Sequence, residues 1–273
     1  MNIIEAIFCG IVQGACEFLP ISSSGHLALL HGVLGSLGDG DLYFDILLHL
    51  GTLAAVVIFY FRDICAVALA YIRLIKRIFK KEFDIKTLDS DEKTALILFF
   101  SSVPMVLAPL IKDEAEMISM YPRVIGAILL LNGVMLMLCG RIGRGKREIS
   151  SLSPMGALGI GFFQLAAVMP GLSRSGSTIT GGRVFGLSAE ESVRLSFLMS
   201  IPAIIGANIF TVFDLSSSSA CIDIVPCVCG AITAALVGMA SIWMIKRISK
   251  VGNFNIFGIY CILIGAFFAI YGA

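Results

Sequence analysis

The chain has little charge. Asp, Glu, Lys and Arg make up 14% of its 273 residues, whereas a soluble domain carries about 25%. The few charges nearly cancel, to a net charge of +1, which argues against a nucleic-acid partner. Low charge excludes an ordinary soluble domain. The 58% of hydrophobic residues and the mean hydropathy of +0.94 indicate an integral membrane protein with several spans.

Two further patterns are missing. The N-terminus has neither the basic region nor the cleavage site of a signal peptide, so we expect it to belong to the mature fold. The eight cysteines show no zinc-ligand spacing, because Cys227 and Cys229 are too close together and no second cluster complements them. Most of the cysteines are embedded in apolar runs, and we expect buried thiols.

Long apolar runs dominate what is present. Six of them are long enough, or nearly so, to cross about 30 Å of hydrocarbon as helices. They are residues 43–61, 95–111, 124–140, 193–213, 223–245 and 254–272. Regions 1–37 and 155–188 instead have two short apolar arms around a break rich in Pro, Ser and Gly. Neither arm can cross the bilayer alone. We therefore predict two re-entrant helix–loop–helix hairpins, buried in protein or lining a wet cavity.

The basic residues predict the orientation. They are concentrated in segments 62–93, 141–147 and 246–250. The intervening loops, 112–123 and 214–222, hold only Lys112 and Arg123. Six spans and two hairpins place the three basic segments on one side of a multi-pass plasma-membrane protein, and the positive-inside rule makes that side cytoplasmic. Both termini then lie outside.

A polar motif occurs twice within this apolar sequence. The first copy runs from Gln13 to His26, and a shift of 151 residues superimposes it on the second copy, from Gln164 to Thr178. Each copy is followed by three spans, an odd number, so the second unit is inverted relative to the first. Inverted repeats with broken helices bring their breaks together near the midplane of the membrane. The predicted fold is all-α: one membrane domain, 1–273, with a first repeat at 1–140 and an inverted second repeat at 152–273.

The first motif carries a carboxylate, an amide and an imidazole. Glu17 can bind a divalent cation or act as a base. The alternative is a structural ion pair with Arg174, although such pairs seldom improve stability over apolar packing. Gln13, one turn earlier, can bind substrate, orient Glu17 or make a helix contact. His26 can act as nucleophile, acid or base, or simply be hydrogen-bonded within the fold. His49, in the first span, is expected to face the helix bundle.

The second motif suits an anion. Backbone N–H groups at the start of a helix bind anions, and the serine hydroxyls from Ser173 onward add donors or cap the helix. Arg174 adds a planar charged fork that matches phosphate. An unpaired Arg at this depth costs several kcal/mol, so we expect its partner to be Glu17 or a ligand phosphate. The residues predict a phosphate site and do not separate hydrolysis from transport.

The two motifs resemble those of the undecaprenyl-diphosphate phosphatase, or bacitracin-resistance, family. Gln13 through His26 matches (E/Q)-G-x-x-E-F-L-P-x-S-S-x-G-H, and Pro170 through Thr178 matches P-G-x-S-R-S-G-x-T. The resemblance implies hydrolysis of undecaprenyl diphosphate, a polyprenyl diphosphate lipid, to the monophosphate carrier and phosphate. That reaction recycles the carrier for peptidoglycan synthesis. It also implies a site open to the outer face and assistance by a divalent cation, Mg²⁺ or Ca²⁺.

The motifs and the resemblance together give the candidate residues. The expected catalytic residues are Glu17, Ser23, His26 and Arg174, and the expected substrate contacts are Gln13, Ser22, Ser24, Ser173, Ser175 and Thr178. Glu17 is also the expected metal ligand. Position 13 is Gln where many relatives have Glu, which removes a second carboxylate. The nucleophile stays open among Ser23, His26 and water.

A transporter is the competing prediction, because inverted repeats with broken helices are also transporter architecture. A polyprenyl-phosphate flippase on this scaffold would hold the head group with Arg174 and need no nucleophile. Ala at Ser23 or His26 would then spare much of its function. We expect the polyprenyl tail to lie between spans, against membrane lipid. The sequence does not determine the oligomeric state, and a homodimer stays open.

Overall fold

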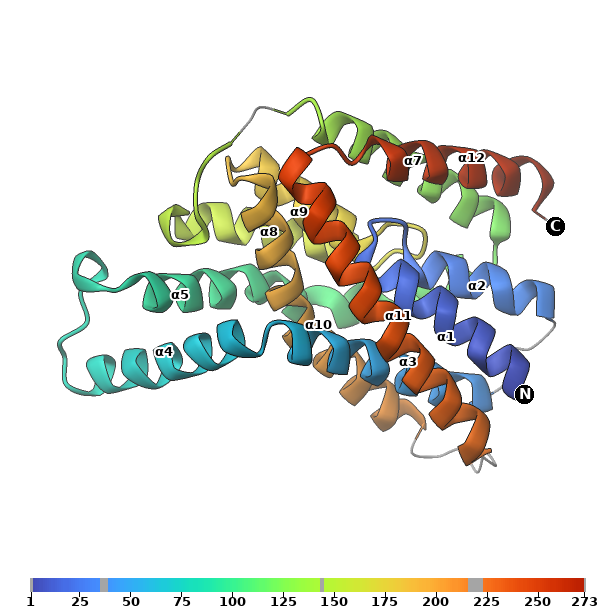
Figure 1. Ribbon diagram of the computed structural model, residues 1–273, viewed down its shortest axis with the longest axis horizontal. Helices are drawn as coiled ribbons and strands as arrows, with labels where there is room; N and C mark the ends of the chain where they lie inside the picture. Colours follow the sequence, from blue (N-terminus) through green and yellow to red (C-terminus); the bar gives the residue numbers. More distant parts are fainter. Residues whose placement is uncertain (1, 35–38, 143–144, 216–222, 273) are drawn as a thin grey trace.

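The computed structural model describes residues 2–34, 39–142, 145–215 and 223–272, and its regular elements there are helices (Figure 1). The first half contains α1 (Ile3–Phe18), α2 (Ser23–Leu34), α3 (Asp39–Phe59), α4 (Phe61–Phe79), η1 (Ile85–Thr87), α5 (Ser90–Ser102), η2 (Val103–Ile111), α6 (Lys112–Ser119) and α7 (Pro122–Cys139). The second half contains η3 (Ile149–Ser151), α8 (Pro154–Ala166), α9 (Arg174–Val184), α10 (Ala189–Leu215), α11 (Ile224–Val251) and α12 (Asn255–Tyr271).

Several of these helices can cross a membrane. Among the described residues, four segments are long and apolar enough by themselves: Ser90–Ser119, Pro122–Cys139, Ala189–Val212 and Ile224–Val251. Helix α3 meets the criterion only together with α4, from which a bend of 84° separates it. Helix α12 is apolar but has 17 residues. An all-α, multi-pass membrane protein is confirmed, whereas the arrangement of six spans and two re-entrant hairpins stays a prediction.

Both predicted hairpins are broken in the middle. Helix α1 ends at Phe18 because Pro20 disfavours helical backbone at the residue before it, and Leu19 is extended (φ −72°, ψ 142°). Ser22 has a left-handed φ of 73°, which turns the chain into α2. In the second hairpin, Ser153 caps the start of α8, and residues 167–173 separate α8 from α9. At each break, the ends of two helices leave backbone N–H and C=O groups without partners inside a helix.

Small residues let the helices pack closely around these breaks. A Cβ atom on Gly14 of α1 would lie 2.6 Å from the carbonyl oxygen of Ala234 in α11. One on Gly133 of α7 would lie 2.7 Å from the carbonyl oxygen of Gly258 in α12. Helices within membranes typically associate through such small residues. Figure 1 shows α7 and α12 side by side, and α11 crossing α1.

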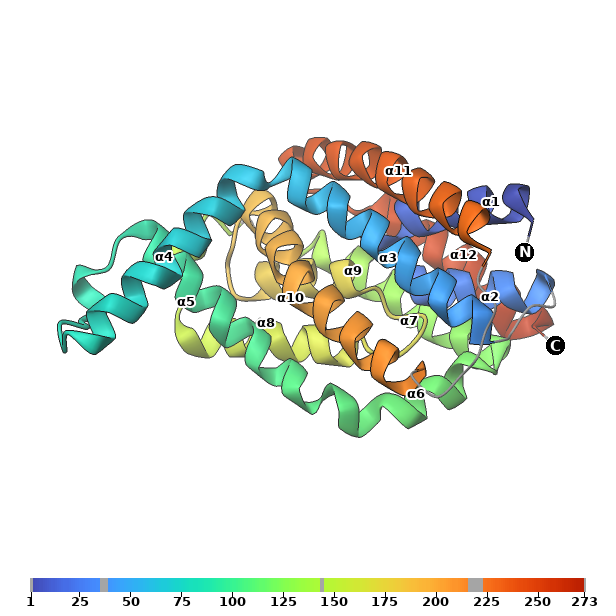
Figure 2. The same cartoon turned by 90° about the horizontal axis from the view of Figure 1, so that it is seen from below.

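The molecule is elongated, with different features at its two ends. Figures 1 and 2 place both chain termini at one end, while the hairpin of α4 and α5 projects from the other. Ion pairs hold that hairpin: Arg77 Nε lies 3.0 Å from Glu92 Oε1, and Arg73 Nη2 lies 3.2 Å from Asp89 Oδ2. The predicted basic segment 62–93 thus forms most of this projection.

Candidate active site

Glu17 is the centre of a buried polar cluster. It lies in the last turn of α1 and is 7% exposed. Its Oε1 forms an ion pair with Arg174 of the second hairpin. Its Oε2 accepts hydrogen bonds from Ser23 Oγ at 2.8 Å and from Gln13 Nε2 at 3.1 Å. The two hairpins, 157 residues apart at this ion pair, therefore meet on one carboxylate.

Arg174 is held at the start of α9. Ser173 caps that helix, its Oγ accepting from the backbone N–H of Gly176 at 3.1 Å. Arg174 Nη1 approaches the carbonyl oxygen of Ser196 in α10 at 3.5 Å. Thr178 donates from its Oγ1 to Ser196 Oγ at 2.7 Å. The guanidinium group therefore lies at a helix N-terminus, with hydroxyl groups close by, as an anion site requires.

Asn132 ties the two breaks together, and the sequence did not single it out. It is fully buried in α7. Its Nδ2 donates to the carbonyl oxygen of Pro20 at 3.1 Å, and its Oδ1 accepts from the backbone N–H of Ser173 at 3.1 Å. The signal was a polar side chain in the middle of an apolar span, which usually marks a functional or packing role.

The backbones of the two breaks also touch directly. A Cβ atom on Gly25 would lie 2.9 Å from the Cα atom of Gly171, which has a φ of +97°. Ser175 Oγ donates to the carbonyl oxygen of Leu19 at 3.3 Å. Glycine is required at Gly25, where a side chain would push the breaks apart, and at Gly171, whose left-handed backbone disfavours other residues. The prediction that the two breaks meet is confirmed.

The imidazoles are distributed differently from what the motif suggested. Among the described residues, His26 bonds to Ser22 and Tyr260 and not to the Glu17 cluster. His49 instead lies near the carboxylate, with Nε2 at 3.9 Å from Glu17 Oε2. Its Nδ1 lies 2.8 Å from the carbonyl oxygen of Asp45, which fixes the ring. Glu17 and Arg174 meet as expected, but the nearest imidazole belongs to the first span.

The remaining predicted hydroxyls serve the local structure. Ser22 is 2% exposed, and its Oγ accepts from the backbone N–H of Gly25 at 3.3 Å. Ser173 and Ser175 are each 1% exposed, and their Oγ atoms are 3.1 Å apart. Ser24 is exposed. The capping role holds for Ser173, and contact with substrate stays a prediction for all four.

Few protein groups around Glu17 can serve as cation ligands. Within the described residues, no group of three or more His, Cys, Asp and Glu side chains comes close enough to hold a metal ion. Gln13 Oε1, however, is buried without a hydrogen-bond partner. A carboxylate and an amide oxygen suit Mg²⁺ or Ca²⁺, provided that substrate oxygens and water complete the shell.

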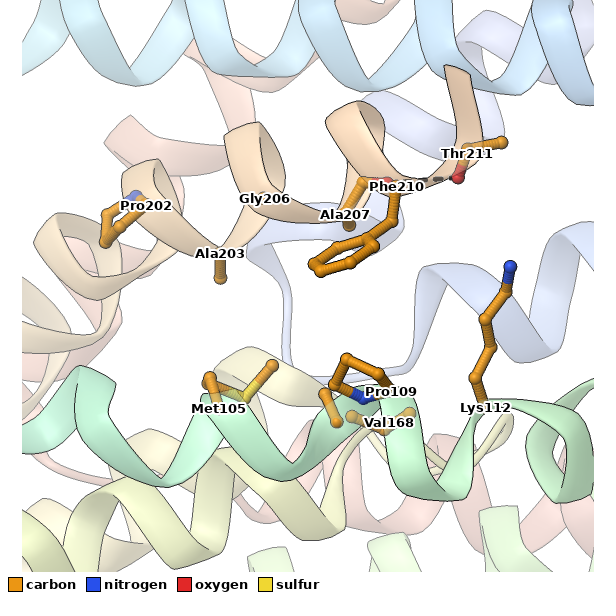
Figure 3. A pocket seen from close by; sticks show the side chains of 11 residues that line it. Met105, Pro109, Lys112, Val168, Pro202, Ala203, Gly206, Ala207, Phe210 and Thr211 are labelled. Atoms are coloured by element: carbon orange, nitrogen blue, oxygen red, sulfur yellow. Dashed lines mark hydrogen bonds between the residues drawn. The ribbon is translucent and has the colours of Figure 1, made fainter. Parts of the chain in front are cut away.

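An apolar cavity of about 250 Å³ opens between η2 and α10 (Figure 3). Met105 and Pro109 line one side, Gly206 and Phe210 the other, and Val168 of the second hairpin break closes it. Helix α10 also carries Ser196, which contacts Arg174, so the near end of the cavity, at Pro202, lies about 9 Å along that helix from the anion site.

A family model and several individual relatives all point to the same family. Residues 6–267 match the family model described as bacitracin resistance protein BacA. The chain is 37% identical over 266 residues to an undecaprenyl-diphosphatase of Desulfosudis oleivorans, with 97% of each chain covered. It is 36% identical over 272 residues to one of Methanosphaera stadtmanae, covering 97% of this chain and 96% of the relative. A third, from Rubrobacter xylanophilus, is 40% identical over 210 residues, covering 76% and 75%.

Proposed function

Because the chain belongs to the bacitracin-resistance protein BacA family, we infer that it is a membrane phosphatase that hydrolyses undecaprenyl diphosphate. The products are undecaprenyl phosphate, the lipid carrier of peptidoglycan synthesis, and inorganic phosphate. One observation supports this site above all others. A buried carboxylate, Glu17, pairs with an arginine of the other hairpin and accepts a hydrogen bond from Ser23. The proposed base (Glu17) therefore lies within hydrogen-bond distance of both the proposed phosphate clamp (Arg174) and the proposed nucleophile (Ser23).

Arg174 is the clamp for the diphosphate in this proposal. Its guanidinium group is paired with Glu17, and a diphosphate oxygen offers the same planar, bidentate acceptor. Substrate binding would draw Arg174 from Glu17 and leave the carboxylate free to take a proton. Thr178, the α9 N-terminus and its serine hydroxyls would supply further donors. Phosphoryl transfer depends mainly on such positioning and charge stabilisation.

Ser23 is the nucleophile that the geometry favours. Its Oγ donates to Glu17 Oε2 at 2.8 Å, within reach for direct proton transfer. As that proton passes to Glu17, the Oγ–P bond forms and the bond from the terminal phosphorus to the bridging oxygen breaks. Undecaprenyl phosphate leaves. Water then attacks the phosphoserine as a base takes one of its protons, the bond from phosphorus to Ser23 Oγ breaks, and Glu17 returns its proton to that oxygen as phosphate leaves. His26, one turn from Ser23 in α2, is the base that we assign to this water.

A divalent cation is part of the proposal. Glu17 and the unpaired Gln13 Oε1 would hold it together with diphosphate oxygens. When bound, such a cation neutralises charge that develops on the phosphoryl oxygens. The Gln at position 13 leaves one carboxylate at the site, so the cation would be held weakly until substrate arrives.

The apolar cavity between η2 and α10 is the place that we propose for part of the polyprenyl tail. Its lining is apolar, and Val168 connects it to the break that leads to Arg174. Figure 3 shows Lys112 at its rim. A tail seated there would keep the diphosphate within reach of both hairpins.

We also propose the inverted repeat and the orientation predicted from the sequence. Gly10 of α1 packs against the backbone of Gly230 in α11, and Gly161, its equivalent, packs against Ser101 in α5. Arg141 and Lys250, from two basic segments, line one polar cavity. The termini lie together at the end opposite the basic hairpin (Figures 1 and 2). These features support termini outside, basic segments in the cytoplasm and a site open to the outer face.

The test is phosphate release from undecaprenyl diphosphate by the purified protein in detergent, with Mg²⁺, with Ca²⁺ and with EDTA. We expect EDTA to suppress release, and Glu17→Gln and Arg174→Ala each to lower kcat/KM by at least about 100-fold. Asp63→Asn is the matched control, because it removes another ion pair between helices, with Arg194 Nε at 2.8 Å. It should stay within about threefold of the unaltered protein. Folded protein that binds the lipid but releases no phosphate would refute the proposal.

A further inference from the structure

The imidazole of His26 has both nitrogens engaged by the protein. Nδ1 lies 2.8 Å from the carbonyl oxygen of Ser22. A carbonyl oxygen only accepts, so Nδ1 carries the proton of the neutral ring. The lone pair is then on Nε2, which lies 3.0 Å from the hydroxyl oxygen of Tyr260. The ring thus has a single neutral tautomer and a defined partner at its other nitrogen.

Tyr260 reaches His26 from a distant part of the chain, in α12. The two rings are nearly parallel, at 14°, with their centroids 5.6 Å apart. This stacking limits rotation of the imidazole, and the hydrogen bond fixes its direction. The next residue, Cys261, is fully buried and lies 3.3 Å from Asn132 Nδ2. The side chain that joins the two hairpin breaks therefore also holds the helix that presents Tyr260.

A tyrosine hydroxyl can keep this bond in both states of the ring. It donates to Nε2 of neutral imidazole, and after rotation it accepts from the N–H of imidazolium. Phenylalanine could preserve the stacking but neither bond. Ser23 precedes His26 by three residues in α2, and residues at this spacing are neighbours on a helix surface. Tyr260 therefore fixes an imidazole that lies one helical turn from Ser23, the residue whose hydroxyl bonds to Glu17.

We propose that Tyr260 is a positioning residue for the phosphatase reaction. It holds the His26 ring, one helical turn from Ser23, in one orientation, whether the ring is neutral or charged. The inference rests on the proposed function, because His26 is the base assigned to the water of the second step. Neither polar motif of the two hairpins contains Tyr260, so the sequence alone did not connect it with the site.

The test compares Tyr260→Phe with Tyr271→Phe, a matched control that removes a hydroxyl from the exposed end of the same helix. We expect Tyr260→Phe to lower kcat for undecaprenyl diphosphate about tenfold and to leave KM within about twofold. In the substrate-free protein, ¹⁵N NMR should show the His26 Nε2 resonance displaced by Tyr260→Phe only. The His26→Gln spectrum assigns that resonance. Thermal unfolding of both variants should match the unaltered protein.

A Tyr260→Phe variant with unchanged kcat, or with an unchanged Nε2 resonance, would overturn the assignment. Loss of kcat accompanied by an equal loss in Tyr271→Phe would also overturn it, because a general effect on α12 would then explain both. Absence of phosphate release from the unaltered protein would refute the proposed function alone. The NMR comparison needs no turnover and would still decide whether Tyr260 fixes His26.

Discussion

Glu17 and Arg174 are each other's counter-ion in the substrate-free protein. Both side chains are largely buried, where an unpaired charge is expensive. The pair removes that cost until a diphosphate arrives. A ligand must therefore carry enough negative charge to compete with a carboxylate already in place. This favours a diphosphate over the monophosphate product, which helps the product to leave.

Replacement of Ser23 separates hydrolysis from transport. We expect Ser23→Ala to lower kcat by at least about 1,000-fold, because the hydroxyl that accepts the phosphoryl group is gone. A Ser23→Ala protein should still bind the lipid, and phosphoserine should be trapped at Ser23 in rapid-quench mass spectrometry of the unaltered protein.

Ser241→Ala is the control for that change. Its hydroxyl donates to the carbonyl oxygen of Val237 at 2.9 Å, a bond within α11 that involves none of Glu17, Ser23 and Arg174, so its loss should leave turnover unchanged. Full turnover by Ser23→Ala would contradict the assignment of Ser23 as nucleophile and leave His26 or water in that role.

Individual residues differ in how far the sequence predicts them. The meeting of Glu17 with Arg174 was predictable, because each is costly alone and the repeat brings their hairpins together. The partners of Asn132 and Tyr260 were not, although the amide of Asn132 stands out within its apolar span. Packing decides which distant segment a given face of a helix contacts. The sequence of one span does not indicate that segment.

The helical elements follow the sequence closely where Pro, Gly and Ser interrupt them. Pro20 and Pro170 mark the two breaks that the structure contains. The predicted span at 95–111 differs more. It begins earlier, at Ser90, and becomes a 3₁₀ helix from Val103, because two prolines, Pro104 and Pro109, cannot donate to regular α-helical hydrogen bonds. Hydropathy measures apolar length, and it does not report this change of helix type.

The irregular η2 segment and α10 enclose the cavity proposed for the tail, and α10 offers a way to fill it. A Cβ atom on Gly206 would have no atom within 4 Å, so Gly206→Trp can be accommodated without a backbone clash. We expect it to lower kcat/KM for undecaprenyl diphosphate about tenfold, because even one or two displaced isoprene units lose more than 1 kcal/mol of apolar burial.

Farnesyl diphosphate is the internal control for Gly206→Trp, since its short tail needs less of the cavity. Its kcat/KM should stay within about threefold, and Gly206→Ala should leave both substrates unaffected. An equal loss for both substrates would place the tail elsewhere and assign the cavity to bulk membrane lipid.

At the scale of the whole molecule, basic residues are concentrated at the end opposite the chain termini. The hairpin of α4 and α5 carries basic residues away from the apolar body, and the termini lie at the far end (Figure 2). Large apolar side chains such as Leu131, Leu236 and Leu263 are exposed on the helices between these ends. Exposed leucines on this scale suit contact with lipid.

Labelling of single cysteines can test the orientation. Lys86 lies between α4 and α5, and Glu114 lies in α6, and both are exposed. In a Cys65→Ser background, which removes an exposed native thiol, a membrane-impermeant maleimide applied to intact cells should label Glu114→Cys and not Lys86→Cys. Permeabilised cells should label both. The reverse pattern in intact cells would invert the proposed topology.

The two halves of the chain, residues 1–140 and 152–273, meet at a seam formed by the two hairpin breaks, and short contacts close it. Asn132 bonds to Pro20 in its own half and to Ser173 in the other, and Gly25 rests against the backbone of Gly171. A carrier that works by rocking one half against the other must open such a seam in every cycle. Here each opening would leave the Asn132 amide oxygen and the backbone N–H of Ser173 without their hydrogen-bond partners. These contacts therefore suit an enzyme that hydrolyses the terminal phosphate at a fixed site better than a transporter whose halves move apart.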